Sequence, residues 1–305
     1  MLDFRPLSPE DAAWLRPVLR DTENLSCDYS PACMVMWGNA SIAECGGFYV
    51  PMVTYNGRSL YLRPIGAGDF IKTLPALFDD SRERGIPFRM YGITPEVRAH
   101  LEETQTFIYT ANRDNFDYLY SVEALASLAG RKLQSKRNHI NRFEAETPDW
   151  SCRPISRENI PECEALITEW YREHYEKGAD PASFDGERRA IATAFDHYET
   201  FGFDGLTLWT GDRLVAFSLG MPLNRTCYDV NFEKALSEMP GAYALINREF
   251  ARLVQEKYPE IRYLNREDDL GSDGLRQAKL SYHPELLLEK YMASLPEDAT
   301  CESQR

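Results

Sequence analysis

In the first half of the chain, some segments alternate between apolar and polar residues, as β-strands do. Others repeat apolar residues every three or four positions, as helices do. Strand-like runs at 45–55 and 58–65 flank the turn Asn-Gly-Arg, which favours a β-hairpin. Further strands are expected at 87–93 and 116–122. Caps and 3.6-residue spacing predict helices at 8–22, 68–85 and 94–103. The order helix, hairpin, helix, strand, helix, strand is that of an α/β layer.

A second series of the same kind follows the segment TPDW. It comprises helices at 156–177 and 185–202, a hairpin at 205–223, a strand at 226–234, a helix at 241–258, a strand at 261–265, a helix at 273–282 and a strand at 285–292. This order is that of the acetyltransferase-like (GNAT) fold. The predicted class is therefore α/β (α+β), with tandem GNAT-like lobes, each a mixed, mainly antiparallel sheet flanked by helices. The expected parts are an N-terminal lobe (1–130), a basic connecting helix (131–150), a C-terminal lobe (151–296) and a disordered tail (297–305).

The net charge, the lengths of the apolar runs and the positions of the cysteines exclude several classes of protein. The 305 residues carry a formal net charge of −14, which argues against DNA and against indiscriminate nucleic-acid binding. No apolar run approaches the ~20 residues of a membrane helix, and no signal peptide is visible, so we expect a cytoplasmic protein. The seven cysteines are scattered, without a Cys-x-x-Cys or Cys/His cluster. Neither a disulfide framework nor a metal site is predicted.

One local basic segment stands out against this acidity. KLQSKRNHINRF at 132–143 has no carboxylate, and as a helix it has one apolar stripe, Leu133, Ile140 and Phe143. Its polar residues are candidates for binding the phosphates of tRNA, CoA or a lipid headgroup. The alternative is an interdomain helix whose cations pair with acids of the two lobes. The candidate residues are Lys136, Arg137, Asn138, His139, Asn141 and Arg142.

Three stretches carry a family resemblance: 112–143, which includes KRNHINRF; 229–250; and 264–291, which includes EDDLGSDGLRQAK. Together they resemble the DUF2156 proteins, related to the C-terminal domain of phosphatidylglycerol lysyltransferase and more distantly to Fem-type aminoacyltransferases. The lysyltransferases move an aminoacyl group from a charged tRNA to a lipid headgroup, and carry a membrane-spanning region that this sequence lacks. The resemblance implies aminoacyl-tRNA as donor, with acyl-CoA as the alternative.

The strand CYDVNFE places Cys227, Asp229, Asn231 and Glu233 on one face. In GNAT-like folds this strand borders the acyl-donor site, so Asp229 or Glu233 is a candidate to accept a proton from an attacking amine. The alternative is a face that simply meets solvent. The following helix starts at Gly241, where free N–H groups offer a phosphate or oxyanion site. The (Q/R)xxGxG/A pattern of CoA-dependent GNAT enzymes is absent.

The run REDDLGSDGLRQAKLSYHP contains the remaining candidates. Its similarity to the LxxFKxxFxP run of the lysyltransferases suggests Lys279 as a contact to the donor ester or phosphate. The spacing that ends at Tyr282 resembles the AxxxY of GNAT enzymes and implies an acid or orienting group. Asp268, Asp269 and Arg276 are expected to shape the acceptor pocket. The alternative is a solvated turn with Arg/Asp ion pairs.

The sequence thus predicts an acyltransferase-like protein. It would transfer an aminoacyl or acyl group to an amine or hydroxyl acceptor, a small molecule or a lipid headgroup, in a cleft between the lobes. Two other functions stay open: a CoA-dependent N-acetyltransferase, and a non-catalytic ligand-binding protein on the same fold. No cofactor is firmly implied beyond the donor substrate.

Overall fold

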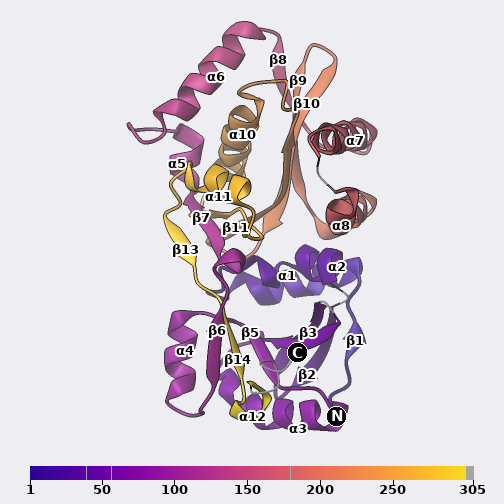
Figure 1. Cartoon of the computed structure of the whole chain (residues 1–305), viewed down its shortest axis with the longest axis vertical. Coiled ribbons are helices and arrows are strands. Elements are labelled where there is room, and N and C mark those ends of the chain that lie inside the picture. Colours follow the sequence, from indigo (N-terminus) through magenta and orange to yellow (C-terminus); the bar gives the residue numbers. More distant parts are fainter. Residues whose placement is uncertain (39, 56, 179, 300–305) are drawn as a thin grey trace.

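The computed structural model describes residues 1–38, 40–55, 57–178 and 180–299. Figure 1 shows two lobes stacked along the long axis, with helices α1 (Ala12–Arg20) and α2 (Pro31–Gly38) at the waist between them. In the described residues, each lobe contains one seven-stranded sheet flanked by helices. Most strand pairs are antiparallel, with parallel pairing between β4 and β5 and between β11 and β12. The predicted fold class, two mainly antiparallel sheets flanked by helices, is confirmed.

The first lobe has the strand order β1-β2-β3-β4-β5-β14-β6. Its strands are β1 (Arg5–Pro6), β2 (Ser41–Cys45), β3 (Phe48–Tyr55), β4 (Arg58–Leu62), β5 (Arg89–Ile93), β6 (Ile108–Ala111) and β14 (Tyr291–Ser294). Helices α3 (Leu74–Arg84) and α4 (Pro95–Glu102) flank this sheet.

The second lobe has the strand order β13-β7-β12-β11-β10-β9-β8. Its strands are β7 (Asp117–Ser121), β8 (Trp150–Pro154), β9 (Asp204–Thr210), β10 (Arg213–Pro222), β11 (Cys227–Ala235), β12 (Tyr263–Asn265) and β13 (Leu286–Leu288). One face packs on α5 (Val122–Ser127), α6 (Gln134–Glu146) and α10 (Ala242–Lys257). The opposite face packs on α7 (Ile160–Glu176), α8 (Asp185–Asp196) and α9 (Tyr198–Phe201). Helix α11 (Asp273–Leu280) follows β12 and precedes β13.

Local sequence signals fix several of these elements. Gly85 ends α3 in the left-handed conformation, at φ 66°, which glycine adopts without strain. The hairpin expected around 56–58 is present, with Tyr55 paired to Arg58, while Asn56 lies outside the described residues. At the C-terminus, Pro296–Ala299 form the short helix α12, and residues 300–305 of the predicted disordered tail lie outside the described residues.

The single strand predicted at 285–292 is wrong. The structure has two strands there, and they belong to different sheets: β13 pairs with β7 in the second lobe, and β14 inserts between β5 and β6 in the first. The strand predicted at 116–122 for the first half is β7, a member of the second sheet. Because the chain crosses between sheets at both places, the lobes are interlocked. The predicted domain boundaries stay a prediction, and the sheets do not follow them.

A buried ion pair lies where the chain crosses from β13 to β14. Lys290 donates from Nζ to Asp117 Oδ1 at 2.7 Å and to Asp28 Oδ2 at 2.8 Å. The second oxygen of Asp117 accepts the Cys27 N–H and the Asn265 side-chain amide, each at 2.9 Å. Burial opposes the charge of Lys290, but the two carboxylates raise its pKa above the usual value. The buried Lys290 side chain lies between β13 and β14, where the single strand predicted at 285–292 is interrupted.

The basic segment is helical, as predicted, and forms α6. The apolar stripe of Leu133, Ile140 and Phe143 is buried in the core that also contains α10. The strands before and after α6, β7 and β8, both belong to the second sheet. Helix α6 therefore connects two strands of one sheet.

Candidate active site

Strands β11 and β12 diverge soon after they meet. They pair in parallel only from Cys227 opposite Tyr263 to Asp229 opposite Asn265. Strand β12 ends at Asn265, whereas β11 continues to Ala235. The loop that leaves β12 therefore moves away from β11, and side chains of both segments meet in the opening between them.

A β-bulge in β11 sets the direction of the side chains at this opening. The register with β10 shifts between Leu219 and Met221, so β11 contains one extra residue there. Asp229, before the bulge, and Asn231, within it, face Cys33 of α2. After it, Phe232 packs with the α7/α8 core, and Glu233 faces α10. The prediction that Asp229, Asn231 and Glu233 share one face is therefore wrong for Glu233.

Arg266 and Glu233 form a buried ion pair at the opening. Arg266 Nη2 donates to Glu233 Oε1 at 2.8 Å, and the Asn247 amide donates to Glu233 Oε2 at 3.1 Å. The guanidinium lies over the rings of Tyr120 and Tyr282, 5.5 and 4.9 Å from their centroids. Burial opposes the charge of Arg266, but Glu233 raises its pKa. Its Nη1 is buried and, within the described part of the chain, has no hydrogen-bond partner.

Lys136 brings helix α6 to the same opening. Its Nζ lies 3.9 Å from the centroid of the Tyr282 ring and donates to Ser281 Oγ at 2.7 Å. Burial and the nearby Arg266 charge lower the pKa of Lys136. The Tyr282 ring thus contacts two cations, Lys136 and Arg266, and burial raises the pKa of its hydroxyl.

Other predicted residues of α6 lie away from the opening. Arg137 donates to the Leu128 carbonyl and, at 2.8 Å, to the Gly130 carbonyl, so it caps the chain after α5. Arg142 pairs with Glu146 on the surface at 2.8 Å. The side chains of three further candidates are exposed, and their phosphate-binding role stays a prediction: Asn138, His139 and Asn141.

The start of α10 packs directly against α6. Gly241 has φ 99°, and a Cβ there would collide with the His139 carbonyl and lie 2.9 Å from Phe143 Cβ. Glycine is therefore required by close packing at this position. The predicted phosphate or oxyanion role of Gly241 is not tested by these contacts and stays a prediction.

Lys279 holds the loop that carries Arg266. Its Nζ donates to the Arg266 carbonyl at 2.5 Å and to the Asp268 carbonyl. Burial lowers the pKa of the Lys279 ammonium. The predicted contact to the donor stays a prediction, while the structure shows Lys279 bound to this main chain. Asp268 is partly buried, which raises its pKa to about 6.

Asp269 and Arg276 form an ion pair. This is the alternative that the sequence analysis gave to a role in shaping the acceptor pocket. Arg276 donates to both oxygens of Asp269 at 2.8 and 2.9 Å, and to Asp114 at 2.6 Å. Tyr118 and Arg113 also donate to Asp269 Oδ2, at 2.5 and 3.3 Å. Burial opposes the charge of Asp269, but Arg276 and Tyr118 hold its pKa below the usual range. This network fixes α11 to the segment between β6 and β7.

Sequence reasoning missed Arg266, Asn247, Glu267 and Cys33. Asp229, predicted as a catalytic base, meets Cys33, Asn231 and Glu267 on the α2 side of the opening. Burial, with a smaller effect of the Asp117 charge, raises the pKa of Asp229 to about 7. An arginine directly after a predicted strand was the one local signal for Arg266; Cys33 and Glu267 carry none, since their partners are distant in sequence.

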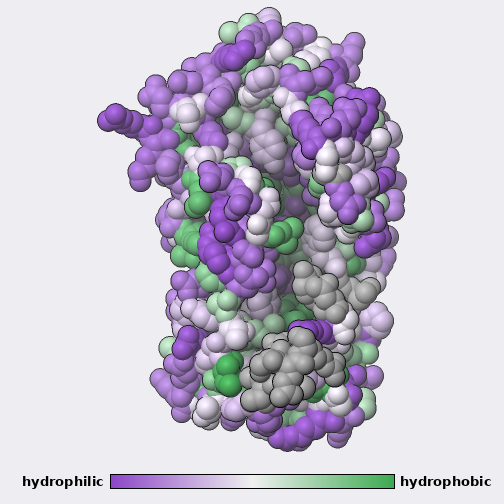
Figure 2. Space-filling view, viewed as in Figure 1, coloured by the Kyte–Doolittle hydropathy of each residue, from purple (hydrophilic) through white to green (hydrophobic). Residues whose placement is uncertain are grey.

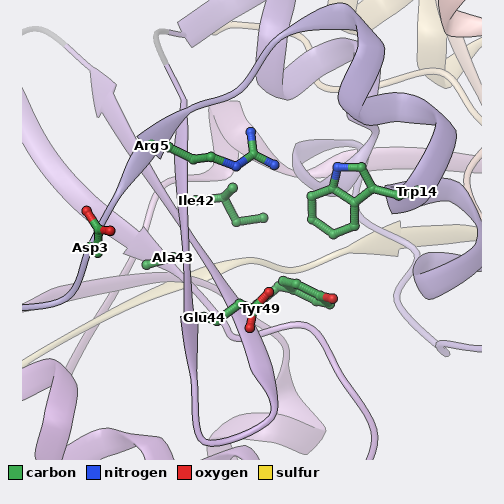
Figure 3. A pocket seen from close by; sticks show the side chains of 7 residues that line it. All are labelled: Asp3, Arg5, Trp14, Ile42, Ala43, Glu44 and Tyr49. Atoms are coloured by element: carbon green, nitrogen blue, oxygen red, sulfur yellow. The ribbon is translucent and has the colours of Figure 1, made fainter.

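Two surface pockets lie elsewhere. Figure 3 shows a pocket of about 360 Å³ in the first lobe, lined by Arg5, Trp14 and Tyr49 among others. A second, of about 770 Å³, lies between α1, the β10–β11 turn and the end of α10. None of the sequence-predicted site residues lines either pocket. Figure 2 shows the second lobe hollowed beside α11, with strongly polar residues over α11 and over the α7/α8 side.

Comparison with known proteins identifies the family. Residues 20–294 match the family described as phosphatidylglycerol lysyltransferase, C-terminal. The chain belongs to this family. The resemblance noted in the sequence is thus confirmed over most of its length.

Solved structures support the same assignment. A conserved protein of unknown function from Bacteroides thetaiotaomicron VPI-5482 is 37% identical, with TM-score 0.91 over 97% of this chain and 100% of that one. The C-terminal domain (DUF2156) of a putative lysylphosphatidylglycerol synthetase from Agrobacterium fabrum is 14% identical, with TM-score 0.67 over 97% and 96%. FemX is 8% identical, with TM-score 0.60 over the whole of both chains. The last two show a shared fold alone.

A curated relative, an uncharacterized protein of Mycoplasmoides gallisepticum, is 23% identical over 180 residues. That match spans 59% of this chain and 56% of the relative's length. None of the helices that the structure describes combines the length and the apolar character needed to cross a bilayer.

Proposed function

We propose that this protein is an acyltransferase that moves an aminoacyl or acyl group onto an amine or hydroxyl acceptor at the opening between β11 and β12. The observation that supports this most is Arg266, whose Nη1 is buried where the two strands diverge and has no hydrogen-bond partner among the described residues. A buried N–H without a partner loses about 1–3 kcal/mol, more when charged, which a ligand oxygen would recover. In GNAT-like folds the donor enters at this divergence.

In this proposal Arg266 donates from Nη1 to an oxygen of the donor, the reacting carbonyl or an adjacent phosphate. Glu233 holds the guanidinium in place through the 2.8 Å contact, and Asn247 in turn holds the Glu233 carboxylate at 3.1 Å. The rings of Tyr120 and Tyr282 exclude water around it, so that its charge acts in a medium of low dielectric constant. Lys136 adds a second positive charge above Tyr282.

The donor is proposed to be an aminoacyl ester carried by tRNA. Such an ester is already activated, so alignment of donor and acceptor can supply up to about 10 kcal/mol without a covalent intermediate. The family description and the lysylphosphatidylglycerol synthetase relative favour transfer of a lysyl group to a lipid headgroup, and the resemblance to the lysyltransferases favours the tRNA donor. A small amine is the other acceptor we consider. The acyl-CoA alternative predicts that acetyl-CoA raises the melting temperature.

The test is transfer of label from a pool of radiolabelled aminoacyl-tRNAs to phosphatidylglycerol vesicles or to small amines. We expect transfer by the wild type and a loss of about 10²–10³-fold in Arg266→Met, the size of effect that follows removal of one preorganised donor. Arg142→Met, which removes an exposed arginine paired with Glu146, is the matched control and should retain transfer. Equal transfer by wild type and Arg266→Met would refute the proposal. Absence of transfer from every charged tRNA, with stabilisation by acetyl-CoA, would favour the CoA-dependent alternative.

A further inference from the structure

The α2 side of the opening contains a second cluster of polar side chains. It consists of Cys33 from α2, Asp229 and Asn231 from β11, and Glu267 from the loop after β12. Cys33 Sγ lies 3.5 Å from Asp229 Oδ2 and 3.3 Å from Glu267 Oε1. Cys33, Asp229 and Asn231 are each more than nine-tenths buried. Three segments from both ends of the chain thus bring a thiol, two carboxyl groups and an amide together.

Within the described part of the chain, the carboxyl groups of this cluster have no direct ion pair; the Lys279 ammonium acts on Glu267 only from a distance and donates to main-chain carbonyls. Among the described residues, no lysine, arginine or histidine lies within ion-pair distance of Asp229 or Glu267. The Asn231 amide nitrogen lies 2.8 Å from Asp229 Oδ2, 3.2 Å from Cys33 Sγ and 3.4 Å from Glu267 Oε1. An amide NH₂ has two hydrogens, so it cannot donate to all three acceptors. Buried carboxylates are normally paired or bound to a metal.

An unpartnered atom in the cluster points to a missing ligand. Asn231 Oδ1 is buried and, in the described residues, has no hydrogen-bond partner. Asp229 Oδ1 is buried too, and its neighbour is the Ser30 hydroxyl. A half-turn of the Asn231 amide would exchange its nitrogen for Oδ1. The cluster would then present four ligand atoms: a sulfur from Cys33 and one oxygen each from Asp229, Asn231 and Glu267.

The separations of these four positions fit a small tetrahedral cation. With Zn–S near 2.3 Å and Zn–O near 2.0 Å, the ligand atoms of a tetrahedral site are about 3.5 Å apart for S–O and about 3.3 Å for O–O. Five of the six separations run from 2.8 to 3.5 Å, and the sixth, between the carboxylate oxygens of Asp229 and Glu267, is within 4.8 Å. A thiolate ligand favours zinc-like cations over magnesium and calcium, which prefer oxygen alone.

We propose that Cys33, Asp229, Asn231 and Glu267 form a binding site for a divalent zinc-class cation. Binding replaces the Cys33 S–H bond by a sulfur–metal bond and releases that proton to solvent. Four protein ligands make a closed, structural site. The cation fixes α2 to β11 and to the loop after β12, and so positions Arg266, the residue before Glu267. This inference does not depend on which reaction the protein catalyses.

The experiment titrates chelator-treated wild-type protein with Co²⁺ and Zn²⁺. We expect one equivalent of Co²⁺ to produce a thiolate-to-cobalt charge-transfer absorption that Zn²⁺ abolishes, and Zn²⁺ to raise the melting temperature. Cys33→Ala and Asp229→Asn should lose the absorption, while Cys163→Ala, a control at a buried cysteine in the α7/α8 core, should retain it. If the folded wild-type protein shows no such absorption, the proposal is overturned, and this result does not depend on whether any variant folds. Full retention of the absorption in Cys33→Ala would also overturn it.

Discussion

Arg266 shows at the residue scale how a side chain acquires a role from contacts that are distant in sequence. Its partners Tyr120, Glu233 and Tyr282 come from three different elements or loops, and Asn247 of a fourth holds Glu233. The sequence singled out Glu233 and Tyr282, because one lies on a polar strand and the other ends a recognisable motif. The position of Arg266 directly after a predicted strand is a weak signal that does not reveal its partners, and nothing local separates Asn247 from any other helical asparagine.

Tyr282 was predicted as an acid or an orienting group, and its contacts favour orientation. Its ring contacts Lys136 and Arg266, at 3.9 and 4.9 Å from the centroid. We therefore expect Tyr282→Phe to retain transfer within a few-fold. Tyr282→Ala should lose about 10-fold, since a desolvated cation–π contact contributes on the order of 1–2 kcal/mol. Initial rates on a single donor check this, and a loss in Tyr282→Phe as large as in Tyr282→Ala would assign the acid role to the hydroxyl.

Asp80 gives a residue-scale test of stability away from the site. Burial opposes its charge, but Arg84, Tyr61 and the Leu2 N–H together hold its pKa below the usual value. A lowered folded-state pKa stabilises the fold above the unfolded pKa of about 3.9, and this stabilisation is lost as the pH falls below it.

Asp80→Asn should therefore lower the free energy of unfolding at pH 7 by about 1–3 kcal/mol. The difference from wild type should shrink as the pH drops below about 4, where the Asp80 carboxylate of the unfolded chain takes up a proton before that of the folded chain does. Urea denaturation across this range measures it. The neighbouring Asp79→Asn, at an exposed position, is the control and should stay within about 0.5 kcal/mol of wild type. A pH-independent loss in Asp80→Asn would contradict the electrostatic explanation.

At the scale of elements, periodicity and capping predicted most helices, the hairpins and the apolar stripe of α6. They did not predict the β11 bulge or the separation of β13 from β14. A bulge is specified by the partner strand, and the residues 285–292 read as one strand because Leu286–Leu288 and Tyr291 are apolar on both sides of Lys290. Only the position of Asp117 and Asp28 in the fold explains why Lys290 turns inward.

Lys290→Met is predicted to destabilise the protein by about 3–5 kcal/mol, because it leaves Asp117 buried without its cation. The double variant Lys290→Met/Asp117→Asn should recover part of the loss, since it removes the uncompensated charge. Chemical denaturation measures both, with Lys257→Met, which breaks an ion pair of a mostly exposed lysine, as control. Wild-type stability in Lys290→Met would show that the ion pair does not stabilise the junction.

At the scale of the whole molecule, the two lobes are joined by chain crossings, by the Lys290 ion pair and by contacts of α2 with β11. The fold class and the family could be predicted from the order of elements and from three motifs. Only some of the residues at the opening between β11 and β12 could be predicted from the sequence. The basic helix contributes Lys136 to it, while Arg137 and Arg142 serve local contacts. The charge pattern showed that cations gather on α6 but not which of them face inward.

The location of the donor is the central claim, and a crystal structure with a hydrolysis-resistant aminoacyl-adenosine analogue tests it most directly. The account predicts the analogue between β11 and β12, with an acyl or phosphate-equivalent oxygen about 3 Å from Arg266 Nη1. An analogue bound only in the pocket beside α1, or only on the exposed face of α6, would contradict it.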